Sequence, residues 1–181
     1  MDIQIPRALA AATLNVTLCA DLKITNIAQM DPCSQVLVDV EIIVLVDWPS
    51  RDVPDTLVHQ GFIVFVKGGP EPDHYNAQEL RDEHVVPRRT GRPEHADLVY
   101  THRPLGELPA IVALAQQLGA KAVWRQTGLN GAGDRDPHGC WSPEEESREA
   151  RRIVESAGLA YVENPYIADV AREIGRPATS G

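Results

Sequence analysis

Cysteine is scarce in this sequence, which contains only Cys19, Cys33 and Cys140 among its 181 residues. The number is odd, and no Cys-x-x-Cys spacing is present. A disulfide framework of the kind found in small secreted domains would need paired cysteines. The chain is therefore predicted to work in a reducing, cytoplasmic compartment.

Positive charge is also scarce, because 17 Lys and Arg face 26 Asp and Glu, for a formal net charge of −9. Nucleic-acid binding needs clustered Lys and Arg that neutralise phosphates. The nearest such group, Arg88, Arg89 and Arg92, is diluted by acidic neighbours. The mildly apolar stretch at 8–20 is too short and too polar to cross a bilayer, and it lacks the features of a signal peptide. We expect no nucleic-acid partner and no membrane association.

Residues 41–69 organise the rest of the chain. The apolar, β-branched run at 41–46 predicts a strand buried on both faces of a parallel sheet. Ser50 as N-cap, Pro54 in the first turn and Gly61 at the end predict a short helix. Residues 62–66 predict a second strand, so the segment forms a right-handed βαβ unit.

Strands and helices continue to alternate along the chain. Further strands are predicted at 98–101, 121–125 and 159–162, and further helices at 106–118, from Ser142 to 157, and at 167–174. This is the pattern of an α/β doubly wound fold with a mainly parallel sheet.

The stretches between or outside these units are less regular. Residues 71–92 lack a clear period, with an ordered loop predicted at Tyr75-Asn76 and a short strand at Val85-Val86. Residues 130–141 are rich in Gly and Asp and predict a loop. We divide the chain into a poorly ordered N-terminal extension at 1–39, one domain at 40–176 and a tail at 177–181.

Polar residues and glycines follow the predicted strands where their carboxyl ends meet. Ligands of doubly wound sheets bind beyond these ends. The loops there supply polar atoms or free backbone N–H groups, but none supplies a nucleophile beside its base. They indicate a site for an anionic, nucleotide-like ligand. The candidate residues are Trp48, Ser50, Arg51, Lys67, Gly68, Gly69, Arg103, Pro104, Gln126, Thr127, Gly128 and Asn164.

Four segments carry a resemblance to a known family. They are Lys67-Gly68-Gly69 after the second strand, 98–104 (LVYTHRP), 111–128 (IVALAQQLGAKAVWRQTG) and 157–165 (AGLAYVENP). The third is the most specific, because it joins a helix, Gly-Ala-Lys, a strand containing tryptophan, and Gln-x-Gly. Residues 40–175 resemble the CoA-binding domain family, which is related to the N-terminal domain of the succinyl-CoA synthetase alpha subunit.

This resemblance implies a Rossmann-like, three-layer αβα fold and coenzyme A or an acyl-CoA as ligand. The ligand would lie across the carboxyl ends of the strands, with phosphates near residues 50–51 and the adenosine end near 67–69. Lysine 67 would meet a phosphate, and the two glycines would allow close backbone approach. Residues 103–104 would border the ligand and 126–128 would line its far side, with Asn164 close behind. The histidine that transfers a phosphoryl group in the related ligase has no equivalent here.

The loop after the first strand departs from the family pattern. Family members usually have a glycine-containing Gly-x-Ser type turn, whereas this chain has Asp47-Trp48-Pro49-Ser50. Glycine lets a backbone approach phosphate without a Cβ in the way. Asp47 would repel a diphosphate, and Trp48 would either stack on a base or fill the gap.

Several candidates also have a purely structural interpretation. Solvation or ion pairing explains Lys67 and Arg103 equally well, and helix capping explains Ser50. Trp124 is expected in the core. The one metal-like cluster matches neither a calcium loop nor a zinc site, so no metal is predicted; it consists of Asp134, Asp136, His138 and Cys140.

Three functions remain open. The first is a single-domain CoA-binding protein with no catalysis of its own, acting alone, as a homodimer or with an enzyme partner. The second is an NAD(P)-linked oxidoreductase or a ligase subunit. Two features argue against an oxidoreductase that binds NAD(P). No GxGxxG turn follows Val46, and Lys67 stands where an acidic residue would hold the ribose. The third is a degenerate domain acting through protein–protein contacts, which the glycine-free loop supports.

Overall fold

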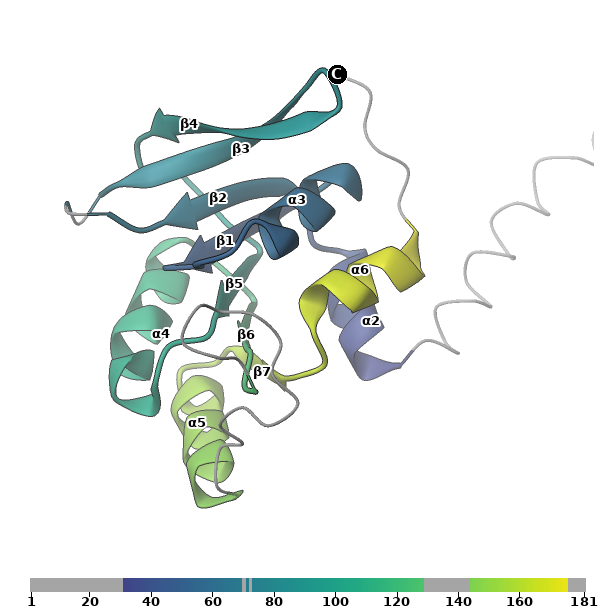
Figure 1. Ribbon diagram of the computed structural model, residues 1–181. Helices are drawn as coiled ribbons and strands as arrows, with labels where there is room; N and C mark the ends of the chain where they lie inside the picture. Colours follow the sequence, from purple (N-terminus) through teal and green to yellow (C-terminus); the bar gives the residue numbers. More distant parts are fainter. Residues whose placement is uncertain (1–30, 70, 72, 129–143, 176–181) are drawn as a thin grey trace, which may run out of the picture.

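The computed structural model describes residues 31–69, 71, 73–128 and 144–175. They form a seven-stranded sheet with helices on both faces (Figure 1). Residues 1–30, 129–143 and 176–181 lie outside the described residues. These segments contain the predicted loop with its metal-like cluster, the Ser142 helix start, the tail and most of the predicted N-terminal extension.

The parallel part of the sheet is built from apolar runs. The strand order is β4-β3-β2-β1-β5-β6-β7. The parallel strands are β1 (Ile42–Val46), β2 (Ile63–Lys67), β5 (Leu98–Thr101), β6 (Ala122–Arg125) and β7 (Ala160–Glu163). The central strands β1, β5 and β6 are almost wholly buried because helices cover both of their faces. The predicted strands and the α/β, mainly parallel fold class are confirmed.

An antiparallel hairpin extends the sheet beyond β2. It consists of β3 (Tyr75–Arg81) and β4 (His84–Thr90). The prediction of a loop at Tyr75-Asn76 is wrong, because these residues begin β3. The hairpin turns at Asp82 and Glu83, which both have positive φ, 47° and 66°. Such turns usually place a glycine after Asn or Asp, and here Glu83 stands in that position.

Strand β4 forms one edge of the sheet. The predicted short strand at Val85-Val86 lies within it. Its following residues, Pro87, Arg88 and Arg89, are exposed.

Helices form a layer on each face of the sheet (Figure 1). On one face lie α3 (Asp52–His59) and α6 (Ile167–Ile174), which pack against each other. On the other lie α4 (Leu108–Gln117), preceded by the 3-10 turn η1 (Leu105–Glu107), and α5 (Glu144–Ser156). A hydrophobic core fills the space on each side of the sheet. The three-layer αβα arrangement is therefore confirmed.

A further helix precedes the sheet on the α6 side. Helix α2 (Pro32–Val38) begins at Asp31, whose carboxylate accepts hydrogen bonds from the N–H groups of Cys33 and Ser34. Its Leu37 is completely buried in the core beneath α6. Part of the segment that the sequence assigns to the extension therefore packs as part of the domain. Among the described residues, no helix has the length and apolarity needed to cross a membrane.

Candidate functional site

The strands β1 and β5 lie side by side at the point where the chain changes direction across the sheet. From β1 the chain passes through α3 to β2 on one side, and from β5 through α4 to β6 on the other. In doubly wound sheets, ligands bind at this switch point beyond the carboxyl ends of the strands. We call this end of the sheet the rim. The loop after β1 and the loop after β5 meet there.

Trp48 fills much of the space at the switch point. Its side chain is only 7% exposed. The ring lies 4.8 Å from that of Tyr100, 5.3 Å from His102 and 6.5 Å from Tyr166, measured between ring centroids. The indole Nε1 donates to Ser50 Oγ at 3.1 Å. Of the two roles that the sequence allows, Trp48 fills the gap left by the glycine-free loop.

The start of α3 reaches the rim without a side-chain cap. Arg51 is the N-cap residue, and its side chain makes no capping hydrogen bond. The Ser50 hydroxyl, predicted as the cap, instead accepts from Trp48. Asp52 turns toward α6, where it accepts from Tyr166 Oη at 2.8 Å. The first N–H groups of a helix have no partner within the helix, but this first turn also contains Pro54, which has no N–H, and the carboxylates of Asp52 and Asp55.

The Arg51 guanidinium is tied to the β3–β4 hairpin. It donates to Gln78 Oε1 at 2.8 Å and to the Val85 carbonyl at 2.7 Å, and it pairs with Asp55 at 2.5 Å. Its predicted contact with a phosphate would therefore require these bonds to break.

The Lys67-Gly68-Gly69 turn leaves β2 at the rim. Lys67 is in register with Val46 and Tyr75, which belong to the core on the α4 side. Paired residues of neighbouring strands point to the same face, so Lys67 lies on the face opposite α3. Within the described part of the chain, its ammonium has no ion-pair partner.

The two glycines are required by contacts inside the protein. A Cβ on Gly68 would lie 2.9 Å from Asp47 Oδ1, and one on Gly69 would lie 2.7 Å from His74 Cγ. Gly69 also has a φ of +136°, which L side chains rarely adopt. Their small size therefore accommodates neighbouring protein groups at this turn.

Arg103 also has a partner within the chain. It donates to both carboxylate oxygens of Glu107 at 2.7 Å, and this hydrogen bonding holds the pKa of Glu107 below its usual range. Pro104 follows as the N-cap residue of η1. Arg103 is nevertheless about one third exposed, and its contact with a ligand stays a prediction.

The loops after β6 and β7 form one polar network. Gln126 accepts from Tyr100 Oη at 3.1 Å and donates to Asn164 Oδ1 at 2.6 Å. Asn164 Nδ2 donates to Thr127 Oγ1 at 2.7 Å, and Gly128 follows with a φ of 71°. The structure brings these four candidates together, but their side chains mainly bind one another. They fix the shape of the rim beside Trp48.

A buried ion-pair cluster at the same end was missed in the sequence. Arg125 is 4% exposed and pairs with Glu163 at 3.4 Å and with Glu146 of α5. Burial, with Glu163 nearby, raises the pKa of the neighbouring Tyr161 to about 12. Arg125 and Glu163 pair in register as the last residues of adjacent strands. Opposite charges at two equivalent strand ends were the available signal.

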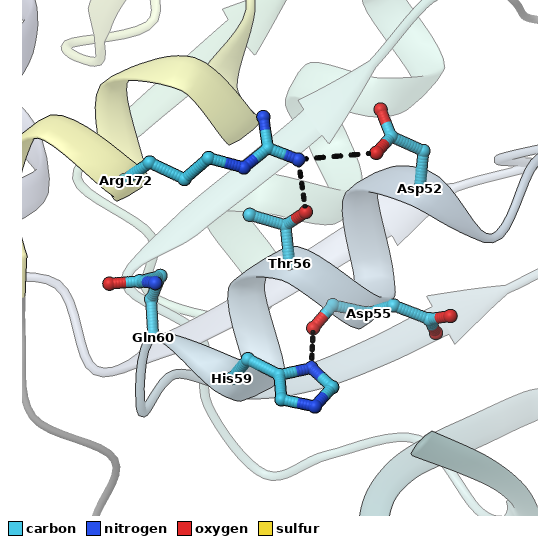
Figure 2. A pocket seen from close by; sticks show the side chains of 6 residues that line it. All are labelled: Asp52, Asp55, Thr56, His59, Gln60 and Arg172. Atoms are coloured by element: carbon cyan, nitrogen blue, oxygen red, sulfur yellow. Dashed lines mark hydrogen bonds and ion pairs between the residues drawn. The ribbon is translucent and has the colours of Figure 1, made fainter. Parts of the chain in front are cut away.

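A shallow pocket of about 300 Å³ lies between α3 and α6 (Figure 2). In it, Arg172 of α6 donates to Thr56 Oγ1 at 2.8 Å and pairs with Asp52 at 3.3 Å. His59 Nδ1 lies 2.7 Å from the Asp55 carbonyl. Arg172 therefore links α6 to α3. No group of three or more potential metal ligands occurs among the residues with described positions.

Comparisons with known proteins identify a family and similar solved structures. A model of the CoA binding domain matches residues 46–168, a span that contains every rim candidate. The crystal structure of Prb, the PH1109 protein redesigned for binding, has a TM-score of 0.52 and 18% identity, covering 78% of this chain and 89% of that one. A Thermus thermophilus structure, cell-free ID.343, has a TM-score of 0.49 and 18% identity, covering 77% and 94%. No curated protein matches the sequence.

Proposed function

The chain belongs to the CoA-binding domain family, and on that premise we propose that it binds coenzyme A or an acyl-CoA at the rim without catalysing a reaction itself. The observation that carries the proposal is the uncapped start of α3 at the switch point, inside the matched residues. The free N–H groups and the dipole of such a helix start attract phosphate, and they have to outweigh the Asp52 and Asp55 carboxylates of the same turn. Among the described residues, the rim offers no nucleophile hydrogen-bonded to a base.

Lys67 supports the proposal as a source of positive charge. It is the rim cation that pairs with no described acid, whereas Arg51 and Arg103 are held by Asp55 and Glu107. Because it lies on the face opposite α3, it would meet a different part of the ligand from the helix start. An elongated ligand with phosphates at both places, as in CoA, can use both.

The experiment is isothermal titration of the purified chain with CoA, acetyl-CoA and ADP. Replacing Lys67 by alanine should weaken CoA binding about tenfold, or about 1.4 kcal/mol, because one charge-assisted phosphate contact is lost. Lys121→Ala is the matched control, because Lys121 is exposed and directly precedes β6, at the end of the sheet opposite the rim. Absence of binding at millimolar CoA would refute the proposal.

A second function follows from the filled switch point. Trp48 is buried, and Arg51, Arg103, Gln126 and Asn164 bind partners within the chain. These features favour a domain that has lost its ligand and acts through protein contacts. Native mass spectrometry separates the two: a co-purifying mass of CoA supports the first function, and a bare homodimer or a complex with another protein supports the second.

A further inference from the structure

Asp47 directly follows β1 at the switch point, and the backbone on both sides of it is fixed. Its N–H donates to the Lys67 carbonyl at 2.7 Å, which continues the pairing of β1 with β2. The next residue, Trp48, is buried against the rings of Tyr100 and His102. Asp47 itself has a φ of 48°, a left-handed conformation that aspartate tolerates better than most residues. The direction of its side chain is therefore set by the chain around it.

The Asp47 carboxylate lies against the turn that follows β2. A Cβ on Gly68 would be 2.9 Å from its Oδ1 atom, so the space that this glycine leaves open is taken by the carboxylate. Asp47 is exposed, and its carboxylate forms no hydrogen bond or ion pair within the part of the chain that the structure describes. It is a negative charge, open to solvent, beside a glycine turn at the rim.

The charge of Asp47 also acts on the loop after β5. Burial and Arg103 lower the pKa of His102, and the carboxylates of Asp47 and Glu107 oppose this shift. Hydrogen bonding to Glu107 raises the pKa of Arg103, and Asp47 acts in the same direction. Ligands of doubly wound sheets bind between the carboxyl ends of the two strands at the switch point, here β1 and β5. A ligand bound there would therefore meet the Asp47 charge.

We propose that Asp47 is a specificity-determining residue of the rim, because its carboxylate weakens the binding of ligands that carry phosphates at the switch point. This inference rests on the proposed CoA-binding function and names the residue that limits the affinity. Like charges a few ångströms apart repel each other even in water, and a diphosphate carries at least two negative charges. Removing the Asp47 charge should therefore tighten the binding of CoA about tenfold.

The test is isothermal titration of CoA and ADP into the wild type, Asp47→Asn and Asp47→Gly. EDTA is present so that no divalent cation bridges the carboxylate and a phosphate. Asparagine keeps the size of aspartate and its tolerance of the left-handed conformation, whereas glycine removes the charge without adding an amide donor. Both variants should bind both ligands more tightly than the wild type. Because the effect is electrostatic, the gain should shrink in about 0.5 M NaCl.

Asp82→Asn is the matched control. Asp82 is also exposed and has a φ of 47°, but it lies in the β3–β4 turn, at the end of the sheet opposite the rim. This variant should bind CoA like the wild type. Near-ultraviolet circular dichroism checks that the packing of Trp48 survives each replacement at position 47.

The outcomes separate this inference from the proposed function. If the wild type binds CoA and the Asp47 variants bind it no more tightly, the inference is overturned while the CoA-binding function stands. A gain that Asp82→Asn shares, that Asp47→Gly lacks, or that persists unchanged in high salt also overturns it. If the Asp47 variants bind CoA and the wild type does not, the inference is supported and the proposed function is overturned. If none of them binds CoA, both are overturned.

Discussion

Replacing Arg125 by alanine should destabilise the fold more than the loss of any surface ion pair. Its side chain is 4% exposed, and its two partners, Glu163 and Glu146, are 16% and 31% exposed. Its Nε also lies 3.5 Å from the Arg103 carbonyl. The replacement therefore leaves two carboxylates together, one of them nearly buried, with no cation between them.

Removing one partner of a fully buried ion pair costs about 3–5 kcal/mol. Both carboxylates keep some contact with water, so we expect the free energy of unfolding to fall by about 2–4 kcal/mol. The double variant Arg125→Met with Glu163→Gln removes charge from both strand ends and keeps most of the volume. It should recover at least about half of the loss, because apolar or neutral groups can replace a buried pair.

Urea unfolding at pH 7, followed by circular dichroism, measures these free energies. Arg148→Ala is the control, since the Arg148–Glu144 pair is 63% and 84% exposed and should contribute about 0.5 kcal/mol or less. If Arg125→Ala costs no more than this control, the buried cluster does not stabilise the protein as argued. A double variant less stable than Arg125→Ala would also contradict the argument.

Two further predictions concern other parts of the fold. Burial alone would raise the pKa of Asp97, but hydrogen bonds from the N–H groups of Ile42 and Glu41 outweigh it and lower the pKa. Asp97 therefore contributes stability above its unfolded pKa that is lost as the pH falls through its folded pKa. Asp97→Asn should cost about 1–2 kcal/mol at pH 7, and the difference from the wild type should shrink toward pH 3 in urea unfolding; a constant difference would contradict this. Gly69→Ala should lower the thermal midpoint by destabilising the fold about 1–3 kcal/mol, whereas Gly91→Ala, whose Cβ meets nothing within 4 Å, should leave it unchanged; equal midpoints would refute the steric argument.

The sequence predicts the parts of the fold that follow from local patterns. Apolar runs locate β1 and β5, and the predicted helix at 167–174 matches α6. Gly61, at a φ of 79°, ends the first βαβ helix as expected. The hairpin was missed because Glu83 follows Asp82 where the usual Asp-Gly turn has its glycine.

The partners of the candidate site residues could not be predicted, because they come from elements distant in sequence. Arg51 was expected to face a ligand, but the missed hairpin supplies Gln78 and the Val85 carbonyl as acceptors. The face of the sheet on which Lys67 lies likewise depends on the strand register, which only the paired strands define. The position of these residues at the strand ends was predictable, whereas their hydrogen bonds were not.

The composition of β4 affects how copies of this chain can associate. An outermost strand with unpaired backbone groups is a template on which another chain can add a strand. Pro87 has no N–H to offer such a strand, and the charged side chains of Arg88 and Arg89, paired with Glu79 and Glu71, lie along the same edge. These features disfavour the addition of a further strand at this edge of the sheet.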